Sequence, residues 1–365
     1  MSPSPNNRWL HRFAVLTALA TLALIGIGGL VTSHEAGMSV PDWPTSYGYN
    51  MFFFPLHKWW HAGNIFYEHS HRLFASGVGF LTTILMVWLW LKESRKWMKW
   101  LGVAAFLAVV LQGVLGGLRV ILFKDQIGIF HATLAQLFFV LTCAIALFTS
   151  KWWMAREASE QESRNPQPAT RNLFLATTVL ILFQLILGAT MRHQHAGLSI
   201  RDFPLAYGKL WPATDAASVA QYNANRIEIT NFNPITAFQI QLQMVHRIVA
   251  MLILCAVAFC AWRAWRNFSG PLAKLSVFWF VLILCQATLG AATILSDKAA
   301  DIATAHVLVG ALSLATGAML SIIAARFPQR AIGVSSSEAV SEREPMMILN
   351  GVTEVGTAGK LPAEI

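Results

Sequence analysis

The chain has 365 residues, of which 55% are hydrophobic and only 12% are charged. A soluble domain of this size cannot bury so much apolar surface, so the composition excludes an ordinary soluble protein and favours a lipid bilayer. The net charge of +9 would suit a nucleic-acid-binding protein. However, the basic residues stand in short clusters between long apolar runs, which indicates membrane topology, and we expect no nucleic-acid partner.

Eight apolar runs follow one another along the chain, each long enough to cross a membrane. About 20 residues at roughly 1.5 Å per residue span a hydrocarbon core of about 30 Å. The first run lacks a small-residue cleavage site at its end, so we interpret it as a retained helix and not as a signal peptide. The runs cover residues 13–32, 69–91, 100–121, 128–150, 172–192, 241–262, 275–295 and 304–325. The sequence therefore predicts an all-α polytopic membrane protein of eight transmembrane helices.

The basic residues between the runs predict the orientation. Fifteen of them lie in loops 92–99, 151–171 and 263–274 and beside the outermost runs, all on one side. The opposite, longer loops carry six: Lys58, Lys124, Arg201, Lys209, Arg226 and Lys298. The positive-inside rule then places the protein in the cytoplasmic membrane with both termini in the cytoplasm.

The two longest outer loops contain an internal repeat. Residues 36–48 align with residues 196–208 at an offset of 160, and the alignment continues through the following helices at an offset of 175. We therefore expect two tandem, related four-helix bundles. The predicted divisions are an N-terminal half at 1–150, a cytoplasmic linker at 151–171, a C-terminal half at 172–327 and a disordered tail at 328–365.

Four histidines are duplicated with the repeat. His71 and His131 are 60 residues apart, as are His246 and His306, and each is expected in the first turn or so of an even-numbered helix. These four helices run in the same direction, so the imidazoles lie at one depth near the outer edge of the membrane. A single membrane histidine is more often a polar contact between helices.

The duplicated spacing instead favours two bis-histidine haem sites, one in each half. Haem iron accepts neutral imidazole, which the positive end of a helix dipole favours. Zinc is less favoured, because it usually needs three or four grouped ligands.

Residues beside the histidines suggest further roles. Arg72 and Arg247 each follow a proposed ligand, where a guanidinium either pairs with a haem propionate or anchors the helix at the membrane surface. His69 aligns with Met244, so a duplicated ligand role is not expected for it. The histidines of the outer loops are interpreted as interfacial polar residues.

One exchange makes the two halves chemically different. Glu68 precedes His71 by three residues, whereas Gln243 holds the same place before His246. A carboxylate can take up a proton or stabilise positive charge, and an amide cannot act as a base. The plain alternative is a favourable acidic residue near a helix start. We expect the N-terminal half to be the reactive one.

The chain resembles the haem A synthase family over residues 10–326, nearly the whole membrane part. The resemblance is carried by Glu68-His69-Ser70-His71-Arg72, the Asp42-Trp43-Pro44 segment, the Gly-Gly-Leu-Val-Thr end of the first helix, the segment Gln112–Gly117 and the four spaced histidines. It departs from many family members in lacking a cysteine pair in the outer loop. The corresponding residues are Val40 and Ser46, and in the second copy Ile200 and Ala206.

The resemblance implies an oxidoreductase that oxidises a ring methyl group of haem O to a formyl group in two steps, giving haem A for terminal oxidases. It implies that His71 and His131 flank the substrate haem O, that Glu68 is the catalytic carboxylate, and that His246 and His306 ligate a haem b cofactor. The implied partners are a haem O synthase and assembly factors of terminal oxidases, and an oligomer is compatible with the sequence.

Two other classes of function fit parts of the pattern. A di-haem b electron-transfer protein linked to quinol would use the same four histidines, but it would not need the difference between Glu68 and Gln243. A transporter built from repeated halves would be expected to carry midplane charges and broken helices. The nearly charge-free apolar runs therefore argue against a transporter.

Overall fold

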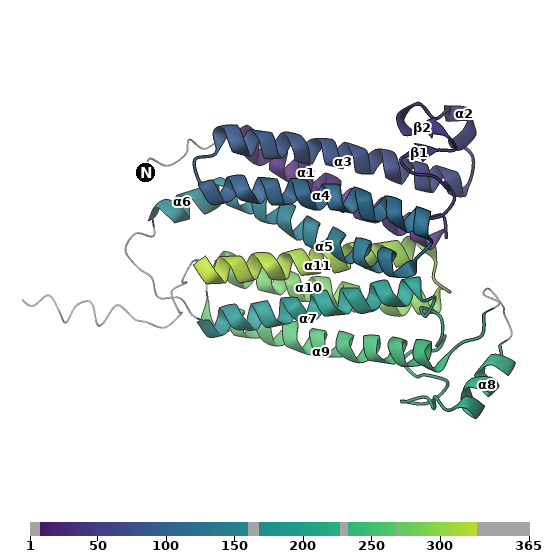
Figure 1. Ribbon diagram of the computed structural model, residues 1–365. Helices are drawn as coiled ribbons and strands as arrows, with labels where there is room; N and C mark the ends of the chain where they lie inside the picture. The colour runs from purple at the N-terminus through teal and green to yellow at the C-terminus, as the bar shows by residue number, and fades with distance from the viewer. Residues whose placement is uncertain (1–7, 160–167, 227–232, 269, 327–365) are drawn as a thin grey trace, which may run out of the picture.

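The structure is a computed structural model and describes residues 8–159, 168–226, 233–268 and 270–326 (Figure 1). Eight of its helices are long and apolar enough to cross a membrane, as predicted. They are α1 (Arg8–Ser33), α3 (Asn64–Lys92), α4 (Lys96–Leu122), α5 (Asp125–Phe148), α7 (Pro168–His193), α9 (Ala237–Asn267), α10 (Pro271–Leu295) and α11 (Ala300–Arg326). The fold is therefore that of a polytopic, almost entirely helical membrane protein. The predicted disordered tail, 328–365, lies outside the described residues.

The shorter elements lie at the two ends of the bundle (Figure 1). One end, called the loop end here, carries the strands β1 (Thr45–Ser46) and β2 (Tyr49–Asn50), the turn η1 (Met51–Phe53), and the helices α2 (Leu56–Trp59) and α8 (Ala216–Ala224). The opposite end carries α6 (Lys151–Ser159) and is called the α6 end.

The long helices begin three to five residues earlier than the apolar runs suggested. Their first turns mix polar, charged or proline residues with apolar ones and so lie outside the continuous apolar runs; Thr236, for example, caps α9 in a reciprocal capping box with Gln239. As a result, His71 is the eighth residue of α3 and His246 the tenth of α9. The prediction that the histidines lie in the first turn was therefore wrong, and the helix dipole, which acts mainly within that turn, has little effect on them.

The long helices are grouped by their contacts into two rings of four. In the first half α1 contacts α3 and α5, and α4 contacts α3 and α5; in the second half α7, α9, α10 and α11 repeat this pattern. Between the halves, α5 contacts α11, α1 contacts α11, and α7 contacts α5. Each half has its own apolar cluster, and a third cluster around Ile25, Phe139 and Ala311 joins them. The division into domains at the predicted boundaries stays a prediction.

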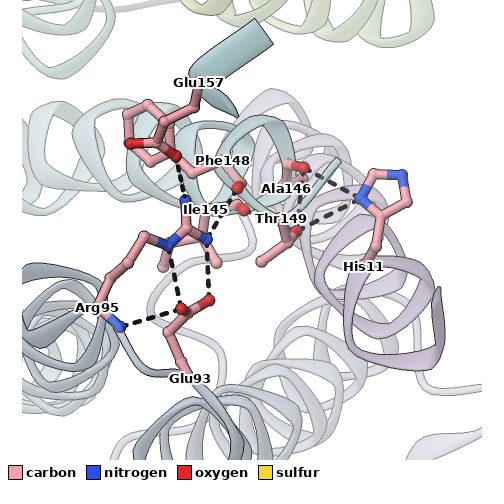
Figure 2. A network of polar contacts seen from close by, with 8 residues as sticks. All are labelled: His11, Glu93, Arg95, Ile145, Ala146, Phe148, Thr149 and Glu157. Atoms are coloured by element: carbon pink, nitrogen blue, oxygen red, sulfur yellow. Dashed lines mark hydrogen bonds and ion pairs between the residues drawn. The ribbon is translucent and has the colours of Figure 1, made fainter. Parts of the chain in front are cut away.

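A polar network closes the α6 end of the bundle (Figure 2). The Arg95 guanidinium lies between α3 and α4 and donates to both carboxylate oxygens of Glu93, at 3.0 and 2.8 Å. It also donates to Glu157 of α6 at 3.1 Å and to the carbonyl of Phe148 at 3.1 Å. Glu157 pairs with Arg326 at the end of α11, so the network ties the two halves together.

The charge of Glu93 depends on this network. Its burial alone would raise the pKa of the carboxyl, but the hydrogen bonds and charge of Arg95 outweigh burial and lower the pKa below its ordinary value of 4.5. The stabilisation from Glu93 is therefore present above about pH 4.5 and is lost as pH falls through the lowered folded-state pKa.

Replacing Glu93 with Gln should destabilise the purified protein at pH 7 by roughly 1.5–3 kcal/mol, the usual contribution of hydrogen bonds to a charged group. The difference between variant and wild type should shrink below pH 4, because wild-type Glu93 then becomes protonated. Apparent Tm in detergent, measured between pH 3 and 7, checks this. Glu157→Gln, at a more exposed position, serves as the control and should lose less; an equal Tm for Glu93→Gln and wild type at pH 7 would contradict the account.

Candidate functional site

A single cavity of about 2020 Å³ extends through the loop-end half of the bundle and is lined by residues of both halves. All four predicted histidines line it. Glu68, Gln243, Arg72 and Arg247 line it as well. The structure thus brings the predicted site residues of each half to one internal space. This volume is about twice the upper end of ordinary ligand pockets, roughly 300–1,000 Å³.

Each histidine ring packs against a glycine of the preceding long helix. A Cβ atom added at that glycine would lie only 3.0–3.4 Å from the ring's Cε1 atom. The four pairs are Gly28 with His71, Gly116 with His131, Gly188 with His246, and Gly290 with His306. At Gly28 and Gly290 a side chain would be crowded against the ring, and at Gly116 and Gly188 it would just touch the ring, so all four glycines let the imidazole lie close to the helix.

Glutamines support three of the four ligand positions from the same preceding helices. Gln112 donates to the backbone carbonyl of His131 at 2.9 Å, and Gln184 donates to that of His246 at 2.9 Å. Gln286 lies 3.5 Å from Nε2 of His306. Each stands four residues before the glycine that contacts the ring, in the pattern Gln-x-x-Leu-Gly, which occurs three times.

The fourth copy of this pattern has Leu24 in place of glutamine, before Gly28. His71 therefore lacks the amide that supports the other three. The repeated Gln-x-x-Leu-Gly pattern is a sequence signal from which these supporting residues could have been found.

The histidines meet a simple test of fitness for haem. Nδ1 of all four rings is buried without a hydrogen-bond partner, an arrangement that is costly for a polar atom. A neutral imidazole has one unprotonated nitrogen that can ligate haem iron, and all four rings line the cavity. Among the described residues, no group of three or more His, Cys, Asp or Glu side chains is placed to hold a metal ion. Paired imidazoles in a large, mostly apolar cavity would suit a haem better than a zinc ion.

Glu68 anchors the first outer loop. Its side chain is only 4% exposed; one carboxylate oxygen accepts from the backbone N–H of Val40 at 2.8 Å and the other from Arg72 at 2.6 Å. Arg72 also donates to the carbonyls of Val40 at 2.7 Å and Asp42 at 2.6 Å. Two accepted hydrogen bonds leave further lone pairs of the carboxylate free.

Gln243 anchors the second outer loop in the same place. Its oxygen accepts from the N–H of Ile200 at 2.8 Å, and its nitrogen donates to the Ile200 carbonyl at 3.0 Å. Arg247 donates to the carbonyls of Asp202 and Leu205, both at 2.9 Å. The single amide of Gln243 thus binds both the N–H and the carbonyl of Ile200, whereas Glu68 binds the N–H and Arg72 the carbonyl of Val40. The two arginines act on the loops, and a role with propionates stays a prediction for them.

An aspartate holds the turn inside each outer loop. Asp42 accepts from the N–H groups of Tyr47 at 2.7 Å and Gly48 at 2.8 Å. Burial alone would raise the pKa of Asp42, but these bonds and one from Thr45 lower it below its ordinary value of 3.8. They also hold Tyr47 at a φ of 51°, a left-handed conformation that is costly for a tyrosine.

The positions of the missing cysteine pair are filled by packing. Val40 and Ser46 are both fully buried, and the Ser46 hydroxyl lies 3.2 Å from Nδ1 of His69. His69 is 1% exposed and contacts the edges of the Phe54 and Trp59 rings. His69 is therefore part of the packing of the first outer loop.

Two cavity-lining residues were missed by sequence analysis. Arg119 near the end of α4 and Arg192 near the end of α7 both line the cavity. They lie at the ends of apolar runs that were interpreted as nearly free of charge. Their position on the inner face of the bundle, and not the composition of the run, marks them as functional candidates.

Comparison with known proteins agrees with this geometry. The family model described as Cytochrome oxidase assembly protein (COX15-CtaA) matches residues 11–317. A protein named "Heme A synthase" from Rhizorhabdus wittichii is 27% identical over 350 residues, covering 86% of this chain and 93% of that protein. One of the same name from Agrobacterium fabrum is 28% identical over 338 residues, covering 82% of this chain and 86% of that protein. With its match spanning both halves and all four histidines, the chain belongs to the COX15-CtaA family of cytochrome oxidase assembly proteins.

Proposed function

We propose that the chain is a haem A synthase, an oxidoreductase that converts a ring methyl group of haem O to a formyl group. The observation that carries the proposal is a cavity lined by two equivalent histidine pairs, of which the first has a carboxylate, Glu68, three residues before its first histidine and the second has an amide, Gln243, at the same place. The names of the relatives support the same function. A haem O synthase would supply the substrate, and terminal oxidase assembly would consume the product.

The two pairs take different roles in this proposal. His71 and His131 hold the substrate haem O, because Glu68 lies on their side of the cavity. His246 and His306 hold haem b, whose iron supplies one-electron redox chemistry when bound. The histidines of both pairs pack against glycines in the same way. The chemical difference between the two pairs therefore comes from the residues around the rings and not from the histidines themselves.

Glu68 is proposed to hold or accept a proton while the methyl group is oxidised. It lines the cavity one helical turn before His71, and its ion pair with Arg72 keeps it fixed in place. Gln243 is equally buried and anchors its loop in the same manner, but it has no basic oxygen of this kind. The difference between Glu68 and Gln243 therefore leaves the outer loop anchored in both halves but places a proton acceptor only at Glu68, in the first half.

The proposed site lies at the external side of the cytoplasmic membrane. The start of α1 and the end of α11 both lie at the α6 end (Figure 1). The residues that line the cavity include many of the loop end. With the positive-inside rule, this puts both termini in the cytoplasm and the loop end outside.

A reporter fused after Arg330 should lie in the cytoplasm, so only a reporter that functions in the cytoplasm should be active there. A reporter inserted beside Asn223 in α8 should lie outside, so only a reporter that functions outside should be active there. Alkaline phosphatase and green fluorescent protein fusions measure this. Phosphatase activity at the C-terminal fusion would reverse the orientation.

The histidine pairs should differ in what their loss does. His246→Ala or His306→Ala should remove the haem b that co-purifies with the protein, because an iron ligand is lost. His71→Ala or His131→Ala should leave haem b in place and chiefly abolish conversion of haem O. Haem extraction and chromatography of each purified variant measures both. Equal loss of haem b from all four variants would contradict the division of roles.

Glu68→Gln gives the first half the residue that the second half already has, so the variant should fold and keep its loop anchored. It should retain haem b but form roughly 10²–10⁴-fold less haem A per unit time, the usual contribution of a general acid or base. The ratio of haem A to haem O in cells that also make haem O measures this. Gln243→Glu, which adds a carboxylate in the other half, is the matched control and should leave haem A formation near wild type.

Wild-type haem A levels in the Glu68→Gln variant would show that Glu68 only anchors the loop. Absence of haem A from cells expressing the unmodified protein, with haem b still bound, would instead favour a di-haem electron-transfer protein.

A further inference from the structure

Two arginines lie one helical turn beyond glycines that contact the histidine rings. Arg119 follows Gly116, which contacts His131, by three residues, and Arg192 follows Gly188, which contacts His246, by four. Each therefore lies about 5 Å further toward the loop end than its glycine. Both line the cavity, from opposite halves of the chain.

The charges of these arginines are poorly compensated by the protein. Nε of both is buried without a hydrogen-bond partner. Arg192 donates through Nη2 to the Gly29 carbonyl at 2.7 Å and to the Ser33 hydroxyl. Within the described ranges, Arg119 has no hydrogen bond and neither arginine has a carboxylate oxygen within 4.0 Å. A half-buried guanidinium that has a buried, unpartnered Nε and no counter-ion is disfavoured, so an anion is expected beside it.

The surrounding groups increase the positive charge. Lys298, in the turn before α11, lies close enough to Arg192 for the two to repel. Burial and this repulsion lower the pKa of Lys298 below its ordinary value, and Glu35 opposes the shift only in part. Glu68 and Asp125 attract Arg119 from beyond ion-pair distance, but the Glu68 carboxylate is already paired with Arg72.

The duplicated scaffold does not itself require either arginine. An offset of 174 aligns Gln112 with Gln286 and Gly116 with Gly290, and it places Thr293 opposite Arg119. The offset of 160 places Thr32 opposite Arg192. Threonine stands at each corresponding position in the other half, so the repeated helix arrangement does not require an arginine there.

Resting on the proposed function, we propose that Arg119 and Arg192 bind haem propionate carboxylates, Arg119 those of the substrate haem and Arg192 those of haem b. Arg119 acts electrostatically on both His71 and His131, and Arg192 acts on His306, one histidine of the pair assigned to it. If a haem held by these histidines has its propionates directed toward the loop end, its carboxylates would lie near the two arginines. Guanidinium and carboxylate pair through two parallel hydrogen bonds. Arg72 and Arg247, by contrast, direct their Nη atoms to loop carbonyls.

The substrate-site arm compares ferric protoporphyrin IX with its dimethyl ester, in which both carboxylates are blocked. Each is titrated spectroscopically into the purified protein that retains haem b. Wild type and the control Lys124→Gln, an exposed lysine at the same end, should bind the free acid roughly 10- to 100-fold more tightly than the ester. Arg119→Gln should bind both with the affinity of the ester, and Arg119→Lys should fall between.

The haem b arm measures transfer of haem b from the purified protein to apomyoglobin. Arg192→Gln should lose haem b roughly 10- to 100-fold faster than wild type or Lys124→Gln, and Arg192→Lys should be intermediate. Monodispersity in gel filtration shows that each variant is folded.

Each alternative result has a distinct meaning. Equal affinity of the wild type for the free acid and the ester, a result that requires no variant, would overturn the proposal. A loss of affinity in Arg119→Gln that is the same for both compounds would also overturn it. Variants that change only the response to added phosphate or anionic lipid would assign the arginines to a phosphate and overturn it too. A wild-type protein that retains no haem b and binds neither compound would instead overturn the proposed function.

Discussion

The contact of an imidazole with a helical glycine is the constraint on which the cavity depends. At four places a glycine lets a histidine ring lie against the backbone of the preceding helix, and at two of them, Gly28 and Gly290, even a methyl group would crowd the ring. Two helices can then approach closely while the ring still borders the cavity. Because the same contact recurs in α1, α4, α7 and α10, the rings of both halves are placed in equivalent ways. The large space between the helices is therefore bordered by paired nitrogen ligands.

The outer loops are fixed by a second repeated arrangement, in which different residues make equivalent contacts. Glu68 with Arg72 holds both backbone groups of Val40, and Gln243 alone holds both of Ile200. This equivalence separates structure from chemistry at the position. The loop needs an acceptor for one N–H group, which either side chain provides. The negative charge and its basicity are extra properties of the first half, so their presence there calls for an explanation in terms of reaction.

Much of this architecture could be predicted from the sequence, because it depends on periodic or local signals. Apolar runs of spanning length predicted the eight helices. The duplicated spacing of the four histidines predicted one pair in each half, and all four line the cavity. The first turns of the helices were missed because their polar residues lie outside the apolar runs, which placed the histidines too close to the helix starts. Arg119 and Arg192 were missed for a different reason: which face of an apolar helix turns inward depends on tertiary packing.

The two halves also differ in how firmly they support their ligands, and this bears on the assignment of roles. A substrate must leave the site after each turnover, whereas a cofactor stays. The carbonyls of His131 and His246 each accept a hydrogen bond from a glutamine, and Gln286 lies beside the His306 ring. At His71 the corresponding residue is Leu24, which can offer no such bond. The ligand with the least support is therefore in the half that has Glu68, and two independent differences, one of charge and one of support, distinguish the same pair of histidines as the site where a haem is exchanged.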